Sequence, residues 1–176
     1  MFAKKIYFLD ETSVHLDMVS LYGWGEKGER VVDYVPDLRF NRQSMISAVG
    51  LNGFIAPYVF RGTLDGERFK DYVDNVLALE MSKGDILILD NLSVHRKKDV
   101  LKTLINKGVQ VIFLPPYSPD YNPIESAWSK IKNLLRRFKN KAEVKLETVL
   151  IELLKMVTET DILNYFRHCG YELSES

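Results

Sequence analysis

The sequence predicts an α/β fold with a mixed β-sheet flanked by helices, and three observations support it. The 176-residue chain begins with strand-like segments and a hairpin, continues with alternating strands and helices, and ends in helices. A hairpin followed by β-α-β alternation needs strands that run in both directions. Hydrophobic residues make up 46% of the chain, enough for one core, and no repeat or linker divides it. We therefore expect a single domain over residues 1–176.

The bulk composition excludes several classes of protein. Lys plus Arg number 24 and Asp plus Glu number 24, so the total charge gives no indication of a nucleic-acid partner. Cys169 is the only cysteine, which excludes an internal disulfide. The start, "MFAKKIYFLD", is too short and too polar for a signal peptide or a membrane span. The expected protein is cytoplasmic, with no membrane partner.

The first half of the chain contains the hairpin. "KKIYFLDET" predicts a strand from about Ile6 to Asp10, and the glycine-rich "GWGEKGER" predicts a turn. Two extended runs flank the dipeptide Asn52-Gly53, which favours a type I′ hairpin turn. Apolar residues keep helical spacing between 66 and 81, and Gly84 follows as a stop signal.

The second half alternates strands with helices. "ILIL" before Asp90 predicts a buried central strand, and "VQVIFL" predicts another strand before the proline-rich loop "PPYSPDYNP". The predicted helices span residues 97–107, 123–138, 145–157 and 161–168.

Three acids occupy positions where a strand or helix end would project them. Asp10 and Asp90 each end a predicted strand, and Glu125 lies in the first turn of a predicted helix. Carboxylate oxygens suit Mg²⁺ or Mn²⁺, and two such ions about 3.5–4 Å apart can promote attack on a phosphodiester. The pattern is compatible with such a site.

Each acid also has a structural interpretation. An aspartate after a strand is often a turn former or a helix cap. In "NPIE", Asn122 would be the N-cap, Pro123 the first helical residue, and Glu125 the third position of a capping box. Taken singly, these explanations compete with a catalytic role.

The helix that starts at Pro123 carries a local basic patch. Its apolar stripe contains Ile124, Trp128, Ile131, Leu135 and Phe138. From Ser126 through Lys141 there is no acid, and the basic residues are Lys130, Lys132, Arg136, Arg137, Lys139 and Lys141. Such charges form either a solvated helix face or a surface for a phosphate backbone.

Taken together, these motifs resemble the catalytic domain of bacterial insertion-sequence transposases in the mariner-like superfamily of DDE transposases. The matching segments are "FLDETSVHL", "YGWGEKGER", "GTLDGERF", "LDNLSVHR" and "LPPYSPDYNPIESAWSKIK". Between Asp90 and Glu125 lie 34 residues (125 − 90 − 1 = 34), the spacing of that family. The resemblance covers nearly the whole chain.

The resemblance implies a ribonuclease-H-like fold, two Mg²⁺ (or Mn²⁺) ions, and a DNA substrate. Asp10, Asp90 and Glu125 would be the catalytic residues and the metal ligands. Water would cleave the phosphodiester at a transposon end, and the freed 3′-hydroxyl would attack target DNA. DNA-binding roles fall on Lys130, Lys132, Arg136, Arg137 and Lys139.

Asn91 and His95 receive supporting roles. Asn91 could orient a metal ligand, or could be a turn residue at the strand end. His95 could contact the scissile phosphate or a ligand, although a lone histidine beside a helix start is more often structural. Trp24 could pack the first hairpin or stack on a base, and packing is favoured. His168 and Cys169 lack a matching pair of ligands, which argues against zinc.

One departure from the family concerns the N-terminus. Relatives carry helix-turn-helix segments that recognise transposon ends, and here we expect that domain to be absent. The chain would then be a truncated protein, the second frame of a split element, or a domesticated remnant.

Alternative functions are a non-catalytic DNA-binding or assembly remnant, and a ribonuclease-H-like nuclease specific for nucleic-acid structure. The resemblance further implies a homodimer in the DNA complex, in a bacterial cytoplasm and at the nucleoid when acting.

Overall fold

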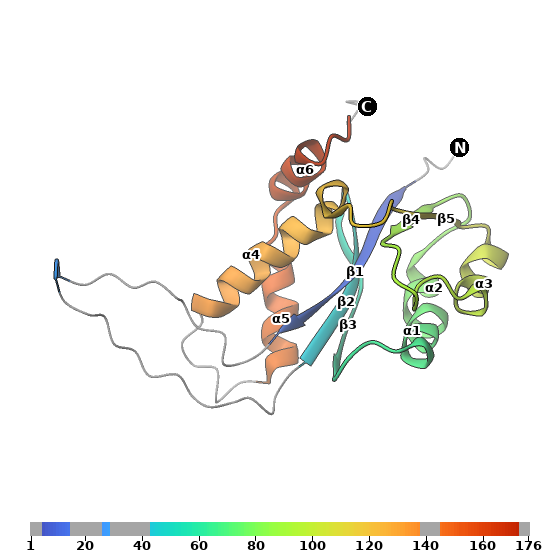
Figure 1. The fold of residues 1–176 in the computed structure, drawn as a ribbon, viewed down its shortest axis with the longest axis horizontal. Coiled ribbons are helices and arrows are strands. Elements are labelled where there is room, and N and C mark those ends of the chain that lie inside the picture. The colour runs from blue at the N-terminus through green and yellow to red at the C-terminus, as the bar shows by residue number, and fades with distance from the viewer. Residues whose placement is uncertain (1–4, 15–25, 29–42, 138–144, 173–176) are drawn as a thin grey trace.

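The computed structural model describes residues 5–14, 26–28, 43–137 and 145–172, and its centre is a five-stranded sheet (Figure 1). The strand order is β3-β2-β1-β4-β5. The strands are β1 (Ile6–Val14), β2 (Gln43–Gly50), β3 (Gly53–Arg61), β4 (Ile86–Leu89) and β5 (Gln110–Phe113).

Helices follow the strands in the predicted order. They are α1 (Gly66–Tyr72), the π-helix η1 (Val73–Leu77), α2 (Ala78–Glu80), α3 (Lys98–Lys107), the 3₁₀ turn η2 (Pro119–Tyr121), α4 (Pro123–Arg137), α5 (Leu146–Lys155) and α6 (Glu159–His168). No helix in the described ranges is long and apolar enough to span a membrane.

The sheet is mixed, as the sequence predicted. β1 pairs antiparallel with β2, which pairs antiparallel with β3. β1 and β4 are parallel, with Leu9 opposite Leu89, and β4 and β5 are parallel, with Leu89 opposite Phe113. The carboxyl ends of β4 and β5 therefore lie at one edge, where open α/β sheets bind their ligands, and β1 passes this edge at Asp10 before it continues to Val14.

Each face of the sheet has its own hydrophobic core. α4, α5 and α6 cover one face, and α1, η1, α2 and α3 cover the other (Figure 1). Side chains alternate along β1, so Phe8 belongs to the first core and Leu9 to the second. The same alternation assigns Asp10 to the α4 face and Glu11 to the α1 face.

The turn of the hairpin differs from the prediction. Gly50 pairs with Gly53, so Leu51 and Asn52 are the two turn residues. Neither has a positive φ, whereas a type I′ turn needs positive φ at both. The type I′ prediction is wrong because the two turn residues lie one position earlier than Asn52-Gly53. Gly53, with φ 118°, adopts the left-handed side of backbone space just after the turn.

Two helix predictions also need correction. The helix predicted over 66–81 contains the π-helix η1, which its apolar spacing did not indicate. The last helix begins at Glu159 instead of near Asp161, because Thr158 is its N-cap. The Thr158 side chain accepts from the Asp161 backbone N–H in a capping box, and the Asp161 side chain accepts from the Thr158 backbone N–H.

Candidate active site

The sheet brings two of the predicted acids side by side. Leu9 and Leu89 are opposite each other on the parallel strands β1 and β4, and Asp10 and Asp90 come next on their chains. Glu125 comes from the first turn of α4, which packs on β1 and β2. Glu125 and Asp90 are both near enough to Asp10 for their negative charges to raise its pKa.

Asp10 is buried, at 7% exposure, and surrounded by like charge. The Trp128 Nε1–H donates to its Oδ2 at 3.1 Å. Burial raises the pKa of Asp10 well above its usual value, and Glu125, Glu11 and Asp90 raise it further. A buried carboxylate beside other carboxylates favours protonation, or a cation that would replace the proton.

Asp90 has a different partner, a buried histidine. His95 is fully buried, and its Nδ1 lies 2.6 Å from Asp90 Oδ1. Asp90 Oδ1 also accepts from the Leu92 backbone N–H at 3.2 Å. Burial works to raise the pKa of Asp90, but the His95 contacts and the Leu92 N–H outweigh it and the net shift is downward. Asp90 is therefore held as an anion.

The other nitrogen of His95 faces Glu11. Nε2 lies 3.4 Å from Glu11 Oε2, an ion-pair contact in which neither atom makes a well-aligned hydrogen bond. Burial lowers the pKa of His95, but its contacts with Asp90 and Glu11 prevail and raise it to about 9. An imidazolium therefore lies between two carboxylates.

Glu125 is not held in the predicted capping box. The backbone N–H of Glu125 donates to the Asn122 carbonyl at 3.1 Å. Asn122 Oδ1 is buried without a hydrogen-bond partner, so it does not accept from the helix. The capping-box prediction is wrong because the Asn122 main chain takes the place of its side chain.

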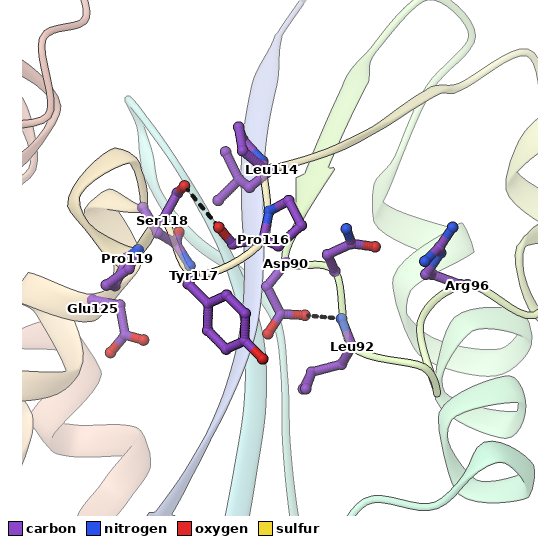
Figure 2. Close-up of a pocket in the computed structure, with 12 residues that line it drawn as sticks. Asp90, Leu92, Arg96, Leu114, Pro116, Tyr117, Ser118, Pro119 and Glu125 are labelled. Carbon is purple, nitrogen blue, oxygen red and sulfur yellow. Dashed lines mark hydrogen bonds between the residues drawn. The ribbon is translucent and has the colours of Figure 1, made fainter.

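A pocket of about 430 Å³ lies between Asp90 and Glu125 (Figure 2). It is lined by Asp90, Asn91, Leu92, Arg96, Leu114, Pro115, Pro116, Tyr117, Ser118, Pro119, Asn122 and Glu125. In the view of Figure 2 the Tyr117 ring lies between the Glu125 and Asp90 side chains. Tyr117 is fully exposed and has φ 55°, a left-handed conformation that is costly for a bulky residue.

The three acids suit a divalent cation, although they do not form a finished metal site. Among the described residues, no group of three or more His, Cys, Asp or Glu side chains is arranged to hold a metal ion. The donor set is nevertheless all carboxylate, which Mg²⁺ and Mn²⁺ prefer. Burial is the largest cause of the raised pKa of Asp10, and the negative charges of Glu125, Glu11 and Asp90, which raise it further, would favour a cation beside it.

The structure places the predicted DNA-binding residues of α4 in different settings. Lys130 Nζ forms an ion pair with Asp161 Oδ2 at 2.5 Å and so joins α4 to α6. Arg136 donates to Asn133 Oδ1, while Lys132 is half-buried and Arg137 is exposed. Lys139 and the earlier candidate Trp24 lie outside the described residues.

Several site residues were missed by the sequence interpretation. Glu11, Arg96 and Tyr117 occurred in quoted motifs without receiving a role, and Trp128 was assigned only to the apolar stripe. Because side chains alternate along β1, the sequence could have placed Glu11 on the other face of the sheet from Asp10. Nothing in the sequence indicated the contact of Glu11 with His95. Asn91 was predicted, and it is half-buried in the pocket beside Asp90.

Residues 5–145 match the family described as DDE superfamily endonuclease. The chain belongs to this family. The match includes Asp10, Asp90 and Glu125, and the family resemblance seen in the sequence is confirmed. Among proteins of curated function, none matches the chain significantly.

Solved structures of Mos1 transposase share the fold. The Mos1 strand transfer complex has a TM-score of 0.72 at 17% identity, over 94% of this chain and 50% of that one. The Mos1 mariner paired-end complex with Mn has a TM-score of 0.72 at 16% identity, over 94% of this chain and 51% of that one. The Mos1 catalytic domain has a TM-score of 0.65 at 16% identity, over 94% of this chain and 75% of that one.

These likenesses confirm the ribonuclease-H-like fold of this DDE endonuclease family member. This chain spans about half the length of the Mos1 chain in each of the two complexes.

Proposed function

We propose that this DDE-family domain cleaves DNA at transposon ends and transfers the resulting 3′-hydroxyl into target DNA. The observation that carries the proposal is the meeting of Asp10, Asp90 and Glu125, in which the other two acids raise the pKa of Asp10. Carboxylates of this kind are stable together when cations neutralise them. Mos1, which has the same fold, has been crystallised as paired-end complexes with Mn and with Mg.

In this proposal Asp10, Asp90 and Glu125 hold two Mg²⁺ or Mn²⁺ ions. The ions would activate the attacking oxygen and stabilise charge on the phosphate that reacts. The protein's own task is to fix the carboxylates, and His95 and the Leu92 N–H do this for Asp90. Pocket residue Asn91 is placed to support the same strand end.

The DNA backbone would run along α4. Lys132, Arg136, Arg137 and Lys139 are proposed to contact phosphates, and the ion pair with Asp161 makes Lys130 the weakest candidate of the set. Binding through phosphates releases counterions, so affinity should fall steeply with salt. A homodimer in the DNA complex remains part of the proposal.

The first test compares cleavage by the wild type and the Asp90→Asn variant, in Mg²⁺ and in Mn²⁺. Labelled duplex, hairpin, flap and transposon-end substrates separate a transposase from a structure-specific nuclease. We expect wild-type cleavage that requires the metal and is abolished in the variant, because Asn lacks the anionic oxygens a divalent ion needs.

A matched control is Asp99→Asn, which changes an exposed aspartate in the first turn of α3. It should cut like the wild type. Equal cleavage by Asp90→Asn would refute the assignment, and DNA binding without any cleavage would favour the non-catalytic remnant.

A further inference from the structure

We infer that Trp128 is a positioning residue that orients Asp10 for metal binding, an inference that rests on the proposed function. The Trp128 indole N–H donates to Asp10 Oδ2 at 3.1 Å. Trp128 is 1% exposed and Asp10 is 7% exposed, so water does not compete freely for this contact. One carboxylate oxygen is therefore tied to α4, which fixes the orientation of the whole carboxylate.

The indole is itself held in place. Its ring stacks on Phe54 of β3, with ring centroids 5.4 Å apart and an interplanar angle of 29°. Ile124 and Ile131, one turn away on either side along α4, are fully buried in the same core. A ring packed on this many sides cannot swing away from Asp10 without opening the core.

Trp128 also connects two of the three acids. It follows Glu125 by three residues on α4, so both side chains lie on neighbouring positions of one helix. α4 therefore supplies the third carboxylate and fixes the first. The separation of Asp10 and Glu125 therefore depends on how α4 packs on β1, and the Trp128–Asp10 hydrogen bond links these two elements.

Core packing alone does not explain the contact. A buried indole N–H needs an acceptor, but a backbone carbonyl would satisfy it without burying a charge. Here the acceptor is a carboxylate whose charged neighbours, Glu125, Glu11 and Asp90, are all acids, and which has the Glu11 backbone N–H as its other donor. Outer partners that orient metal ligands typically control metal affinity by about tenfold to a hundredfold.

The decisive experiment measures Mn²⁺ and Mg²⁺ binding by calorimetry to the wild type and to Trp128→Phe. Phenylalanine retains an aromatic ring in the core but removes the N–H. We expect metal affinity about tenfold weaker or more, with a small change in melting temperature. The matched control Phe166→Leu removes another buried ring of the same core, on α6, but keeps the N–H and its stacking partner, and it should bind metal like the wild type.

The outcomes separate the two proposals. If Trp128→Phe binds metal like the wild type while Asp90→Asn abolishes cleavage, the inference about Trp128 fails and the proposed function stands. If the wild type binds no divalent ion, with or without DNA, both fail. Loss of affinity equal in Phe166→Leu and Trp128→Phe would reduce Trp128 to a packing residue.

A second measurement does not depend on the stability of Trp128→Phe. The sequence has 2 tryptophans, so Trp24→Phe leaves Trp128 as the only indole. If Trp128 touches a metal ligand, Mn²⁺ should quench its fluorescence saturably, with the dissociation constant found by calorimetry. Asp10→Asn should remove the saturable phase. Quenching that never saturates, or that survives Asp10→Asn, would overturn the inference.

Discussion

Asp10 and Asp90 occupy equivalent positions on neighbouring parallel strands, yet their pKa values move in opposite directions. Each follows a residue of the pair Leu9 and Leu89 at the carboxyl edge of the sheet. Burial among acids raises the pKa of Asp10, while His95 and the Leu92 N–H bring the net shift of Asp90 downward against the effect of burial. The paired strands β1 and β4 set where the two aspartates lie, and the different partners of each side chain set its charge.

The difference originates in the two faces of the sheet. On the α4 face, Asp10 meets a neutral donor, the indole of Trp128. On the opposite face, the fully buried His95 lies between Glu11 and Asp90 and packs against the tilted ring of Phe69, with ring centroids 4.6 Å apart. One carboxylate is thus held as an anion, whereas burial and neighbouring acids disfavour the charged form of the other. Metal binding should therefore lower the pKa of Asp10.

The largest effect that would test this comparison is the pH dependence of stability without metal. The pKa of His95 is raised from 6.5 to about 9. The stability that this shift contributes to the folded state is therefore complete below pH 6.5 and is lost as the pH rises through 9. The raised pKa of Asp10 acts in the same direction, but over a window that begins near pH 4. A shift of this size for His95 corresponds to about 3 kcal/mol.

Urea unfolding in EDTA between pH 6 and 9.5 would measure this loss. His95→Gln should flatten the profile over that range, and His168→Gln, which changes an exposed histidine, should leave it unchanged. A wild-type profile that is already flat would show that His95 is neutral between its two carboxylates.

The next prediction contrasts the two aspartates directly. Both Asp10→Asn and Asp90→Asn should abolish cleavage, but their effects on the metal-free protein should have opposite signs. Asp90→Asn weakens a charged hydrogen bond to a buried imidazole and should cost about 2 kcal/mol. Asp10→Asn removes a buried charge from among acids and should stabilise by about 1 kcal/mol, as active-site substitutions often do.

Unfolding curves at pH 7 in EDTA, repeated in Mg²⁺, provide the measurement. Mg²⁺ should stabilise the wild type and neither variant. Destabilisation by Asp10→Asn without metal would contradict the view that Asp10 is a strained charge.

The sequence predicted the parts of this site that local rules determine. An apolar run before Asp90 indicates a strand end, and a Pro at the first helical position places Glu125 at a helix start. The predicted strand end at Asp10 is wrong, because β1 continues to Val14 in its pairing with β2. The mixed sheet followed from the order of the elements. These features depend on periodicity and on turn chemistry, which residues close in the chain decide.

What the sequence did not predict depends on contacts across the fold. Trp128 and Asp10 are 118 residues apart, and their hydrogen bond exists because α4 packs across β1. The same limit applies to His95, where spacing could suggest Asp90 as a partner but not Glu11 from another strand. The prediction of an Asn122 side-chain cap is wrong for a local reason. The main-chain carbonyl of Asn122 accepts the hydrogen bond from the Glu125 N–H in place of its side chain.

The smallest predicted effect concerns Glu11, the outer partner of His95. The distance to His95 is 3.4 Å for Glu11 and 2.6 Å for Asp90, and Coulomb attraction together with hydrogen bonding weakens as the distance grows. Glu11→Gln should therefore lower the pKa of His95 less than Asp90→Asn does, and should cost at most about 1 kcal/mol at pH 7. NMR titration of the His95 imidazole in both variants measures the two shifts. A larger drop in Glu11→Gln would make Glu11 the main counter-ion of His95, and Asp90 would then owe its charge to the Leu92 N–H and to solvent.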